Sequence, residues 1–356
     1  MTHDDIDGIR QRPGMYVGDC SEGWGLHQLI WELLGNAIDQ HLAGQCTQIE
    51  VELGEDGSAA VRDDGPGISL DEVDGVSFAQ LALTRLHHTP TMDGHAPHEH
   101  LSTRGAGLVA VCALSDRLTL EVHRDGRHHA QRFERGRPVA PASLVGPTTR
   151  TGTSITIVPD PSIFRSTCFD AGTLSGRLRE LAYLLPDLHL RFVDRRVHAF
   201  HEPTGLLAYV TSRAQPGSPS PFFVRRSLDT IGVEVALTWG HPWQTSIESF
   251  ANLQRTTDGG THVDGLERGL LAAVRAVLPA ARSLSESALA RALSSGLLAA
   301  VCVRLDDPSY GAPTKDRLHA PRVTAIVERV VTDELTRHLE QRAPLRDFID
   351  ALLTGT

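Results

Sequence analysis

The sequence almost lacks lysine. Lysine and arginine together number 34 among 356 residues, and Lys315 is the only lysine, which leaves 33 arginines. Two interpretations of this single lysine stay open: chance, since some position must be the last, or a site that needs a compact, flexible ammonium. The planar guanidinium of arginine cannot imitate that group. The role of Lys315 therefore depends on what the rest of the chain does.

Other absences exclude whole classes of protein. The five cysteines include no CxxC pair, which argues against a zinc site or a disulfide framework and predicts free thiols in a reducing compartment. No apolar run approaches the ~20 residues of a membrane span, and the acidic N-terminus MTHDDIDGIR is not a signal peptide. A net charge of −10 argues against nucleic-acid binding by the whole surface. We therefore expect a cytoplasmic protein that binds neither a membrane nor DNA directly.

The pattern along the chain predicts two domains that mix helices and strands. The length suits two hydrophobic cores rather than one. Residues 22–43 carry apolar residues at helical spacing, and strand-like and helix-like runs alternate from there to residue 211. Residues 212–222, SRAQPGSPSPF, are rich in proline, glycine and serine, which predicts a linker. In residues 223–356 a strand, a helix and a second strand follow in the order of a crossover unit.

Polar residues interrupt the apolar pattern of the helix predicted over residues 22–43. They recur at intervals of three and four, and they are Gln28, Glu32, Asn36 and Asp39. A solvated helix face would explain them, but three further segments favour a ligand site. DDGPGI (63–68) places a carboxylate before glycines that let a flat ligand approach the backbone. RGAGL (104–108) opens a predicted helix whose free amides suit an anion, and TGTSITI (151–157) adds a hydroxyl in a strand.

In this order and spacing, the motifs resemble the ATPase half of the bacterial DNA gyrase and topoisomerase IV B subunits, which are GHKL ATPases. The resemblance extends from about residue 4 to about residue 350 and is carried by eight segments: IRQRPGMYVGD (9–19), GLHQLIWELLGNAID (25–39), DDGPGI (63–68), RGAGL (104–108), TGTSITI (151–157), IGVEVALTW (231–239), DGGTH (258–262) and TKDRL (314–318). It implies an α+β fold: a GHKL (Bergerat) ATPase sandwich over residues 1–211, with a mixed sheet and helices on one face. A ribosomal-S5-domain-2-like α/β transducer domain follows over residues 223–356.

The resemblance implies catalytic residues for the hydrolysis of ATP. Glu32 matches the general base that activates the attacking water, and Gln28 lies one helical turn before it, where it would orient that base. Lys315 matches the lysine that reaches the γ-phosphate from the second domain. An ammonium completing a phosphoryl-transfer site is a role in which arginine is a poor substitute. The functional interpretation of Lys315 is therefore favoured.

The resemblance also implies residues that bind the cofactors, ATP and Mg²⁺. Asn36 matches the ligand of Mg²⁺, a cation that prefers oxygen ligands. Asp63 matches the acceptor of the adenine amino group, and Thr153 matches the hydroxyl beside it. The other matching residues lie in two glycine-containing loops around the nucleotide: Gly65, Gly67 and Ile68 in the first, and Gly105, Ala106 and Gly107 in the second.

Departures from the family pattern bear on function. No EGDSA-type motif of the metal-binding cleavage module occurs, so we expect a stand-alone homologue that is not a topoisomerase by itself. Only about nine residues precede RQRPGMY, so a homodimer would be weakened by a short N-terminal arm. Gln28, Pro66 and Pro313 stand where the family usually has histidine, arginine and glutamine. Five histidines crowd into residues 87–100, where a metal site and a solvated, pH-dependent loop both stay open.

Three functions remain open on the sequence. The first is a gyrase-B-like protein that hydrolyses Mg·ATP. The second is a kinase-type or ligase-type enzyme that uses ATP on a small molecule, since the altered loop would leave room for a second substrate. The third is a non-catalytic module that binds nucleotides or inhibitors, because Arg124 matches an arginine that meets aminocoumarin drugs in gyrase. An unidentified partner protein, such as a separate cleavage subunit, is compatible with each of them.

Overall fold

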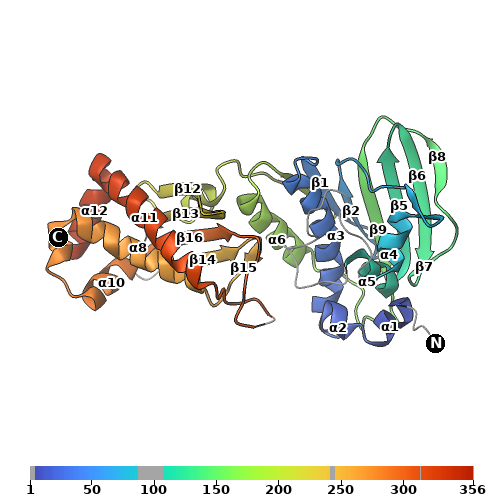
Figure 1. The fold of residues 1–356 in the computed structure, drawn as a ribbon, viewed down its shortest axis with the longest axis horizontal. Coiled ribbons are helices and arrows are strands. Elements are labelled where there is room, and N and C mark those ends of the chain that lie inside the picture. The colour runs from blue at the N-terminus through green and yellow to red at the C-terminus, as the bar shows by residue number, and fades with distance from the viewer. Residues whose placement is uncertain (1–4, 87–106, 241–244, 313, 356) are drawn as a thin grey trace. The chain divides into compact units, whose positions relative to one another are not determined.

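The computed structural model describes residues 5–86, 107–240, 245–312 and 314–355 (Figure 1). The chain divides into two compact units, residues 1–201 and residues 202–356. Each unit has a β-sheet of its own and helices packed against it. The predicted α+β fold class is confirmed.

The first unit is built on a mixed sheet. In the described part of this unit, nine strands follow the order β11-β10-β1-β2-β9-β5-β6-β7, with β8 also paired to β6. The pair of β1 and β10 is parallel, and the pair of β1 and β2 is antiparallel. The strands are β1 (Gln48–Leu53), β2 (Ala59–Asp63), β5 (Ser115–Arg124), β6 (Arg127–Glu134), β7 (Arg137–Pro138), β8 (Ser143–Pro147), β9 (Gly152–Pro159), β10 (His189–Val193) and β11 (Val197–Phe200). A small separate sheet pairs β3 (Glu72–Val73) with β4 (Val76–Ser77).

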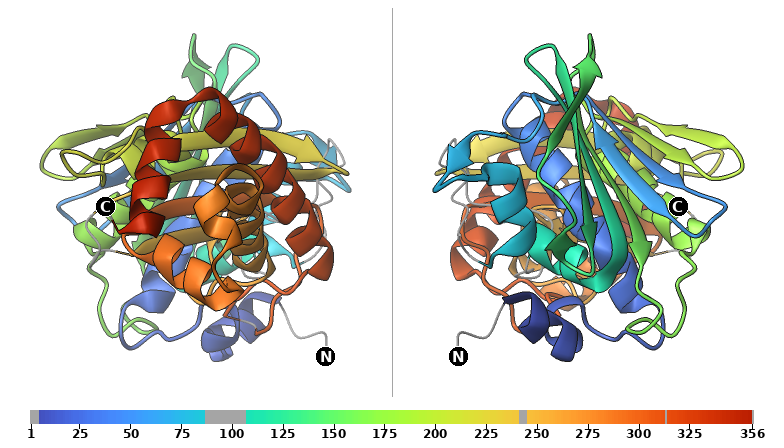
Figure 2. Two further views of the ribbon diagram at one scale, coloured as in Figure 1. Left: turned by 90° about the vertical axis from the view of Figure 1, so that its left-hand side faces the viewer. Right: turned by 90° about the vertical axis from the view of Figure 1, so that its right-hand side faces the viewer.

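Helices cover one face of the first sheet (Figures 1 and 2). They are α1 (Asp5–Gln11), α2 (Gly14–Val17), α3 (Trp24–Leu42), α4 (Phe78–Thr84), α5 (Gly107–Leu114) and α6 (Ala171–Leu184). The apolar stripe of α3 is buried, with Leu26, Leu29 and Ile30 fully excluded from solvent. Burying one such side chain stabilises the fold by about 1.5–3 kcal/mol. The helix predicted over residues 22–43 is thus confirmed.

The second unit is built on a smaller sheet in the order β12-β13-β16-β14-β15. Its strands are β12 (Phe222–Leu228), β13 (Ile231–Trp239), β14 (Ser246–Ala251), β15 (Gln254–Arg255) and β16 (Leu297–Arg304). Its helices are α7 (Leu206–Thr211), α8 (Thr261–Val277), α9 (Pro279–Arg282), α10 (Glu286–Ser294), α11 (Pro321–Gln341) and α12 (Ala343–Thr354). Strands β14 and β16 are parallel neighbours, and α8 lies between them in the chain. The predicted crossover unit is therefore present.

The division between the units lies earlier in the chain than the predicted boundary at residue 211. Helix α7 packs on β13 and β16 of the second unit, where Leu206, Tyr209 and Val210 are buried. The backbone N–H of Leu206 also donates to Glu234 Oε1 at 3.2 Å. The segment predicted as a linker, residues 212–222, consequently connects α7 to β12 within the second unit.

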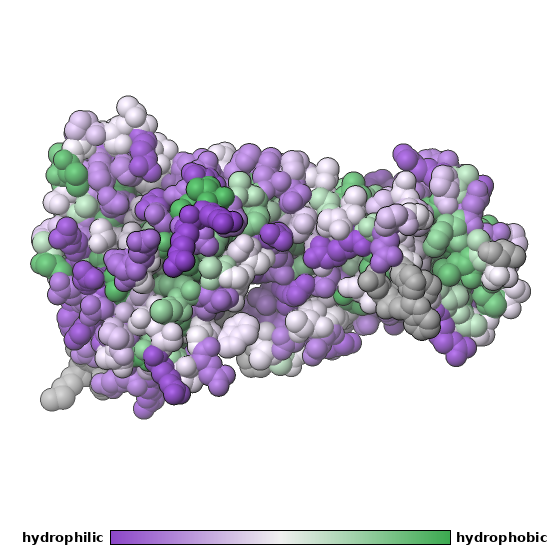
Figure 3. Space-filling model, turned by 180° about the vertical axis from the view of Figure 1, so that it is seen from behind, coloured by the Kyte–Doolittle hydropathy of each residue, from purple (hydrophilic) through white to green (hydrophobic). Residues whose placement is uncertain are grey.

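The described helices include none with the length and apolar character that crossing a membrane requires. On the face drawn in Figure 3, hydrophilic residues cover most of the surface and apolar residues lie in smaller groups between them.

Candidate functional site

Helix α3 holds three of the predicted site residues on its polar stripe. Glu32 is 1% exposed, and its Oε1 accepts a hydrogen bond of 2.8 Å from Gln28 Nε2. Asn36 Nδ2 donates to the backbone oxygen of Glu32 at 2.9 Å. Because the amide nitrogen of Asn36 is bonded to the helix, the amide oxygen is the atom it can offer to a cation. The helix thus presents a positioned carboxylate and an amide oxygen one turn apart on one face.

Asp63, at the end of β2, is a partly buried carboxyl group, and the backbone holds one of its two oxygens. Its Oδ1 accepts from the N–H of Gly65 at 2.9 Å and from the N–H of Thr153 at 3.3 Å. Burial raises the pKa of Asp63 to about 6, although these two hydrogen bonds oppose the rise. Within the described residues, Oδ2 accepts no hydrogen bond. Asp63 can therefore accept a hydrogen bond from a ligand that carries an amino group.

The loop that follows Asp63 packs against neighbouring strands through glycines. At Gly67, where φ is +79°, a Cβ atom would lie 2.9 Å from the backbone oxygen of His123. At Gly152, where φ is +122°, a Cβ atom would lie 1.9 Å from the backbone oxygen of Asp63. Side chains are excluded at both positions, so the backbone of this loop and that of β9 approach each other directly.

Two further contacts hold this loop in place. The N–H of Ile68 donates to Thr153 Oγ1 at 3.0 Å, and Arg124 Nη1 donates to the backbone oxygen of Gly67 at 2.6 Å. Helix α3 lies beside the loop, since a Cβ atom at Gly65 would be 3.6 Å from the Cβ of Gln40. The structure therefore brings the polar stripe of α3, Asp63, the glycine loop and Thr153 into one region of the first unit.

Helix α5 begins at Gly107, whose φ is +61°. The other residues of α5 are apolar and buried. The polar groups that α5 can offer to a ligand at its N-terminal end are therefore its backbone amides. Gly105 and Ala106, predicted to precede it in the same loop, lie outside the described residues, as do Pro313 and the histidine-rich segment 87–100. Among the described residues, no group of three or more histidine, cysteine or acidic side chains could hold a metal ion.

Lys315 lies in the second unit, in the loop between β16 and α11. Its φ is +59°, an uncommon conformation for a residue with a side chain, and its Nζ lies 5.5 Å from the ring centroid of Tyr310. The loop is tied to the turn at residues 258–260: the N–H of Leu318 donates to the backbone oxygen of Gly259 at 3.0 Å. A Cβ atom at Gly260 would lie 2.2 Å from the backbone oxygen of Leu318, so these two segments cross in direct contact.

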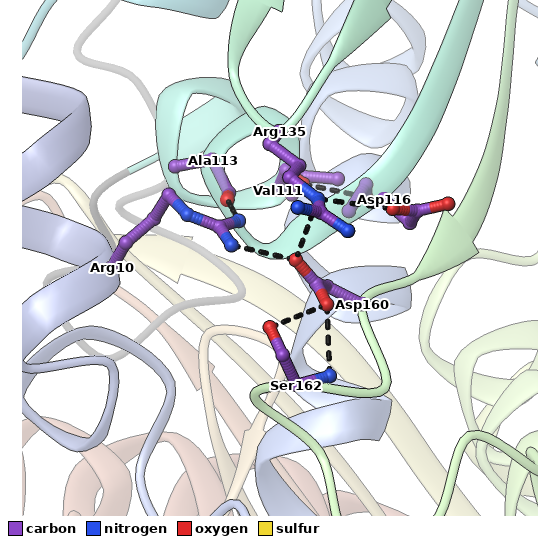
Figure 4. A network of polar contacts seen from close by, with 8 residues as sticks. Arg10, Val111, Ala113, Asp116, Arg135, Asp160 and Ser162 are labelled. Atoms are coloured by element: carbon purple, nitrogen blue, oxygen red, sulfur yellow. Dashed lines mark hydrogen bonds and ion pairs between the residues drawn. The ribbon is translucent and has the colours of Figure 1, made fainter.

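A polar network at the far end of α5 joins segments distant in sequence (Figure 4). Asp160, fully buried, accepts from Arg10 Nη2 at 2.6 Å and from the N–H and Oγ of Ser162 at 2.8 and 2.7 Å. Arg10 Nη1 donates to the backbone oxygen of Ala113 at 2.7 Å, and Arg135 Nε lies 3.5 Å from Asp160 Oδ2. Burial alone would raise the pKa of Asp160, but the hydrogen bonds from Ser162 and Arg10 outweigh it and the pKa is lowered.

The sequence assigned no role to Arg10, Asp160, Gly260 or Tyr310. Arg10 and Gly260 lie inside segments that carried the family resemblance, IRQRPGMYVGD and DGGTH. Their contacts join residues that are far apart in the sequence, and hydrophobic periodicity gives no information on such contacts. Arg10 and Asp160, for example, are 150 residues apart. For the contact of Gly260, the sequence offers one indication, the glycine pair at residues 259–260, because adjacent glycines mark turns in which backbones can approach closely.

Comparison with known proteins identifies the family of the chain. Residues 23–163 match the family described as histidine kinase-, DNA gyrase B-, and HSP90-like ATPase, and residues 204–354 match the family described as DNA gyrase B. The crystal structure of the 43K ATPase domain of Thermus thermophilus gyrase B, in complex with an aminocoumarin, is 30% identical with a TM-score of 0.83. The alignment covers 99% of this chain and 94% of that one. The chain belongs to the gyrase B family.

Curated relatives in the gyrase B family are longer than this chain. The DNA gyrase B protein of Borrelia hermsii is 34% identical over 357 residues, which covers 97% of this chain and 56% of the relative. That of Thermotoga maritima is 34% identical over 368 residues, covering 99% and 58%. The chain thus spans about half the length of these curated relatives. It corresponds to the GHKL ATPase and transducer regions of the gyrase B family.

Proposed function

We propose that the chain binds Mg·ATP in its first unit and hydrolyses it. The observation that carries the proposal is the Asp63 carboxyl group, which two backbone amides hold by one oxygen, so that its other oxygen can accept from a ligand. The adenine amino group would donate to its other oxygen. A carboxylate that accepts a hydrogen bond from an amino group suits adenine better than a sugar.

At the phosphate end, Glu32 would take a proton from the attacking water. Its burial excludes bulk water, and the hydrogen bond from Gln28 fixes the orientation of its carboxylate. An amide cannot become cationic, so this partner orients the base without titrating with it. The oxygen of Asn36 would hold Mg²⁺, and that ion would neutralise negative charge on the phosphates. The first turn of α5, with Gly105, Ala106 and Gly107, would donate backbone amides to the phosphates.

Lys315 would supply a positive charge to the γ-phosphate from the second unit. Its support is twofold: it matches the family lysine, and it is the only ammonium side chain in a chain of 33 arginines. The crossing of residues 316–318 with the turn at 258–260 fixes the backbone on which it is carried. A loop with this much backbone hydrogen bonding suits a residue that must be delivered to one place.

The decisive experiment measures phosphate release from Mg·ATP by the wild type, Glu32→Ala and Lys315→Ala, with nucleotide binding measured on the same samples. We expect turnover in the wild type, its loss in both variants, and retained ATP binding in Glu32→Ala, because that residue acts on water. Binding without phosphate release in the wild type would overturn hydrolysis and leave the nucleotide-binding or inhibitor-binding module. Phosphate release that needs an added small molecule would favour the kinase-type or ligase-type enzyme.

The proposal concerns the hydrolysis of a nucleotide by these 356 residues. A homodimer, or a partner protein that uses the ATPase cycle, would be compatible with this activity.

A further inference from the structure

Helix α5 is short, and its side chains include no strongly polar group that could fix its position by a hydrogen bond. All seven residues after Gly107 are apolar and buried. Apolar packing is non-directional, so it resists exposure of the helix to water better than it resists a small shift along the helix axis. The eight residues span only about 12 Å, so a contact that fixes one end of the helix also fixes the other.

The C-terminal end of α5 is held by directional contacts. Its last carbonyl groups have no partner within the helix. Arg10 Nη1 donates to the oxygen of Ala113 at 2.7 Å, the N–H of Asp160 donates to the oxygen of Leu114 at 3.1 Å, and Ser115 Oγ donates to the oxygen of Val111 at 2.7 Å. The guanidinium of Arg10 also places a positive charge at the negative end of the helix dipole.

Arg10 is itself fixed from two sides. Its second nitrogen, Nη2, donates to the buried Asp160 carboxylate at 2.6 Å, so the guanidinium spans a carbonyl and a carboxylate at once. Its helix, α1, is tied down elsewhere: Asp5 Oδ2 accepts from the N–H of Leu86 at 3.1 Å, and Asp7 Oδ1 accepts from Arg137 Nη2 at 3.0 Å. A Cβ atom at Gly136 would lie 2.6 Å from Ile6 Cγ2, so α1 also packs directly on the turn between β6 and β7.

We propose that Arg10 is a positioning residue for the phosphate end of the nucleotide site, acting through α5. It touches neither the base nor the phosphates; it sets how far the N-terminal amides of α5 project toward them. This inference rests on the proposed function, because the first turn of α5 matters only if it holds the phosphates. Loss of Arg10 should therefore weaken the phosphate-dependent part of nucleotide binding and leave the adenine-dependent part unchanged.

The test compares the affinities of the full chain for a non-hydrolysable ATP analogue with Mg²⁺ and for adenosine, in Arg10→Met and Arg10→Lys. We define the ratio as the affinity for the ATP analogue divided by the affinity for adenosine. In Arg10→Met we expect this ratio to fall about tenfold, which corresponds to the free energy of about one hydrogen bond to a charged group. Arg10→Lys should show a smaller fall, since an ammonium keeps the charge for Asp160 but lacks the fork that reaches both acceptors. If Arg10→Met fails to fold, the lysine variant alone decides the matter.

The matched control is Arg135→Met. Arg135 shares Asp160 and bonds Asp116 Oδ1 at 3.1 Å, but it donates no side-chain hydrogen bond to α5 within the described residues. The ratio should be unchanged in this variant. An equal loss of both affinities in the Arg10 variants, or a fall of the ratio in Arg135→Met as large as that in Arg10→Lys, would reduce the network to a stabilising role and overturn the inference. A wild type that binds adenosine as tightly as the ATP analogue would instead refute the proposed phosphate site, and the inference with it.

Discussion

At the scale of single residues, Asp63 is the group whose chemistry is most open to measurement. A carboxyl group accepts a hydrogen bond from an amino group best when ionised. Burial raises its pKa to about 6, so the ionised form predominates at pH 7 and is lost on acidification through that value. The proposed adenine contact is therefore pH-dependent in a range where an ordinary aspartate would stay ionised.

We expect adenosine to bind about tenfold more weakly at pH 5 than at pH 7, because the ionised fraction of a group with a pKa near 6 falls by that factor. Adenosine is the suitable probe, since it lacks phosphates that would titrate in the same range. In Asp63→Asn the affinity should be low and independent of pH. An affinity for adenosine that stays constant in the wild type between pH 7 and pH 5 would refute the role of Asp63.

Single residues also show where sequence reasoning stops. The sequence predicted Asp63, Gly67 and Thr153 as parts of one site, and the structure brings them together because each lies at the end of a recognisable strand or turn. It could not predict the pairing of Arg10 with Asp160. Which of 33 arginines meets a given buried carboxylate depends on packing, and no local pattern reports it.

At the scale of elements, helices that carry a clear apolar period or a glycine motif were predictable, and two short helices without either were not. The helix predicted over residues 22–43 corresponds to α3, and the helix predicted to follow RGAGL corresponds to α5. Helices α7 and α10 were not predicted, and missing α7 misplaced the boundary between the units. Short helices take most of their stability from tertiary packing rather than from their own residues, so sequence periodicity indicates them weakly.

The packing of α8 on α11 shows how such tertiary contacts override local propensity. Gly265 and Gly269, one turn apart on α8, let the two backbones meet: a Cβ atom at Gly269 would lie 2.7 Å from Val331 Cβ and 2.8 Å from the backbone oxygen of Glu328. Glycine inside a helix lowers helix stability by about 1 kcal/mol relative to alanine. The close crossing of the two helices therefore requires glycine at these positions despite its poor helix propensity.

Gly269→Ala should therefore lower the free energy of unfolding of the second unit by about 1–3 kcal/mol, the usual cost of overpacking, despite the gain in helix propensity. Gly176 in the middle of α6 is the matched control, because a Cβ atom there would meet nothing within 4 Å and the residue is exposed. Gly176→Ala should stabilise its unit by up to about 1 kcal/mol. Urea unfolding of both variants makes the comparison, and stabilisation of both would contradict the close crossing.

At the scale of the whole molecule, arginine stands at 33 of the 34 Lys or Arg positions, so the side chain of Lys315 can be observed separately. Lys315 and the α-amino group at the N-terminus are the only primary amines in the chain. An amine-directed reagent therefore reports on the Lys315 side chain without any mutation. Lys315 is partly buried in its loop, so its reactivity is open to change when a ligand binds.

If Lys315 meets the γ-phosphate, a non-hydrolysable ATP analogue with Mg²⁺ should protect it from modification, because an ammonium bound to phosphate oxygens is both shielded and kept protonated. Adenosine, which occupies only the base end of the proposed site, should give no protection. Mass spectrometry of the modified peptides measures both, and the N-terminal amine provides an internal control that should react equally in all samples. Equal protection by adenosine and by the ATP analogue would mean that the lysine responds to occupation of the base end alone. Labelling unaffected by either ligand would leave chance as the explanation of the single lysine and would remove Lys315 from the proposed site.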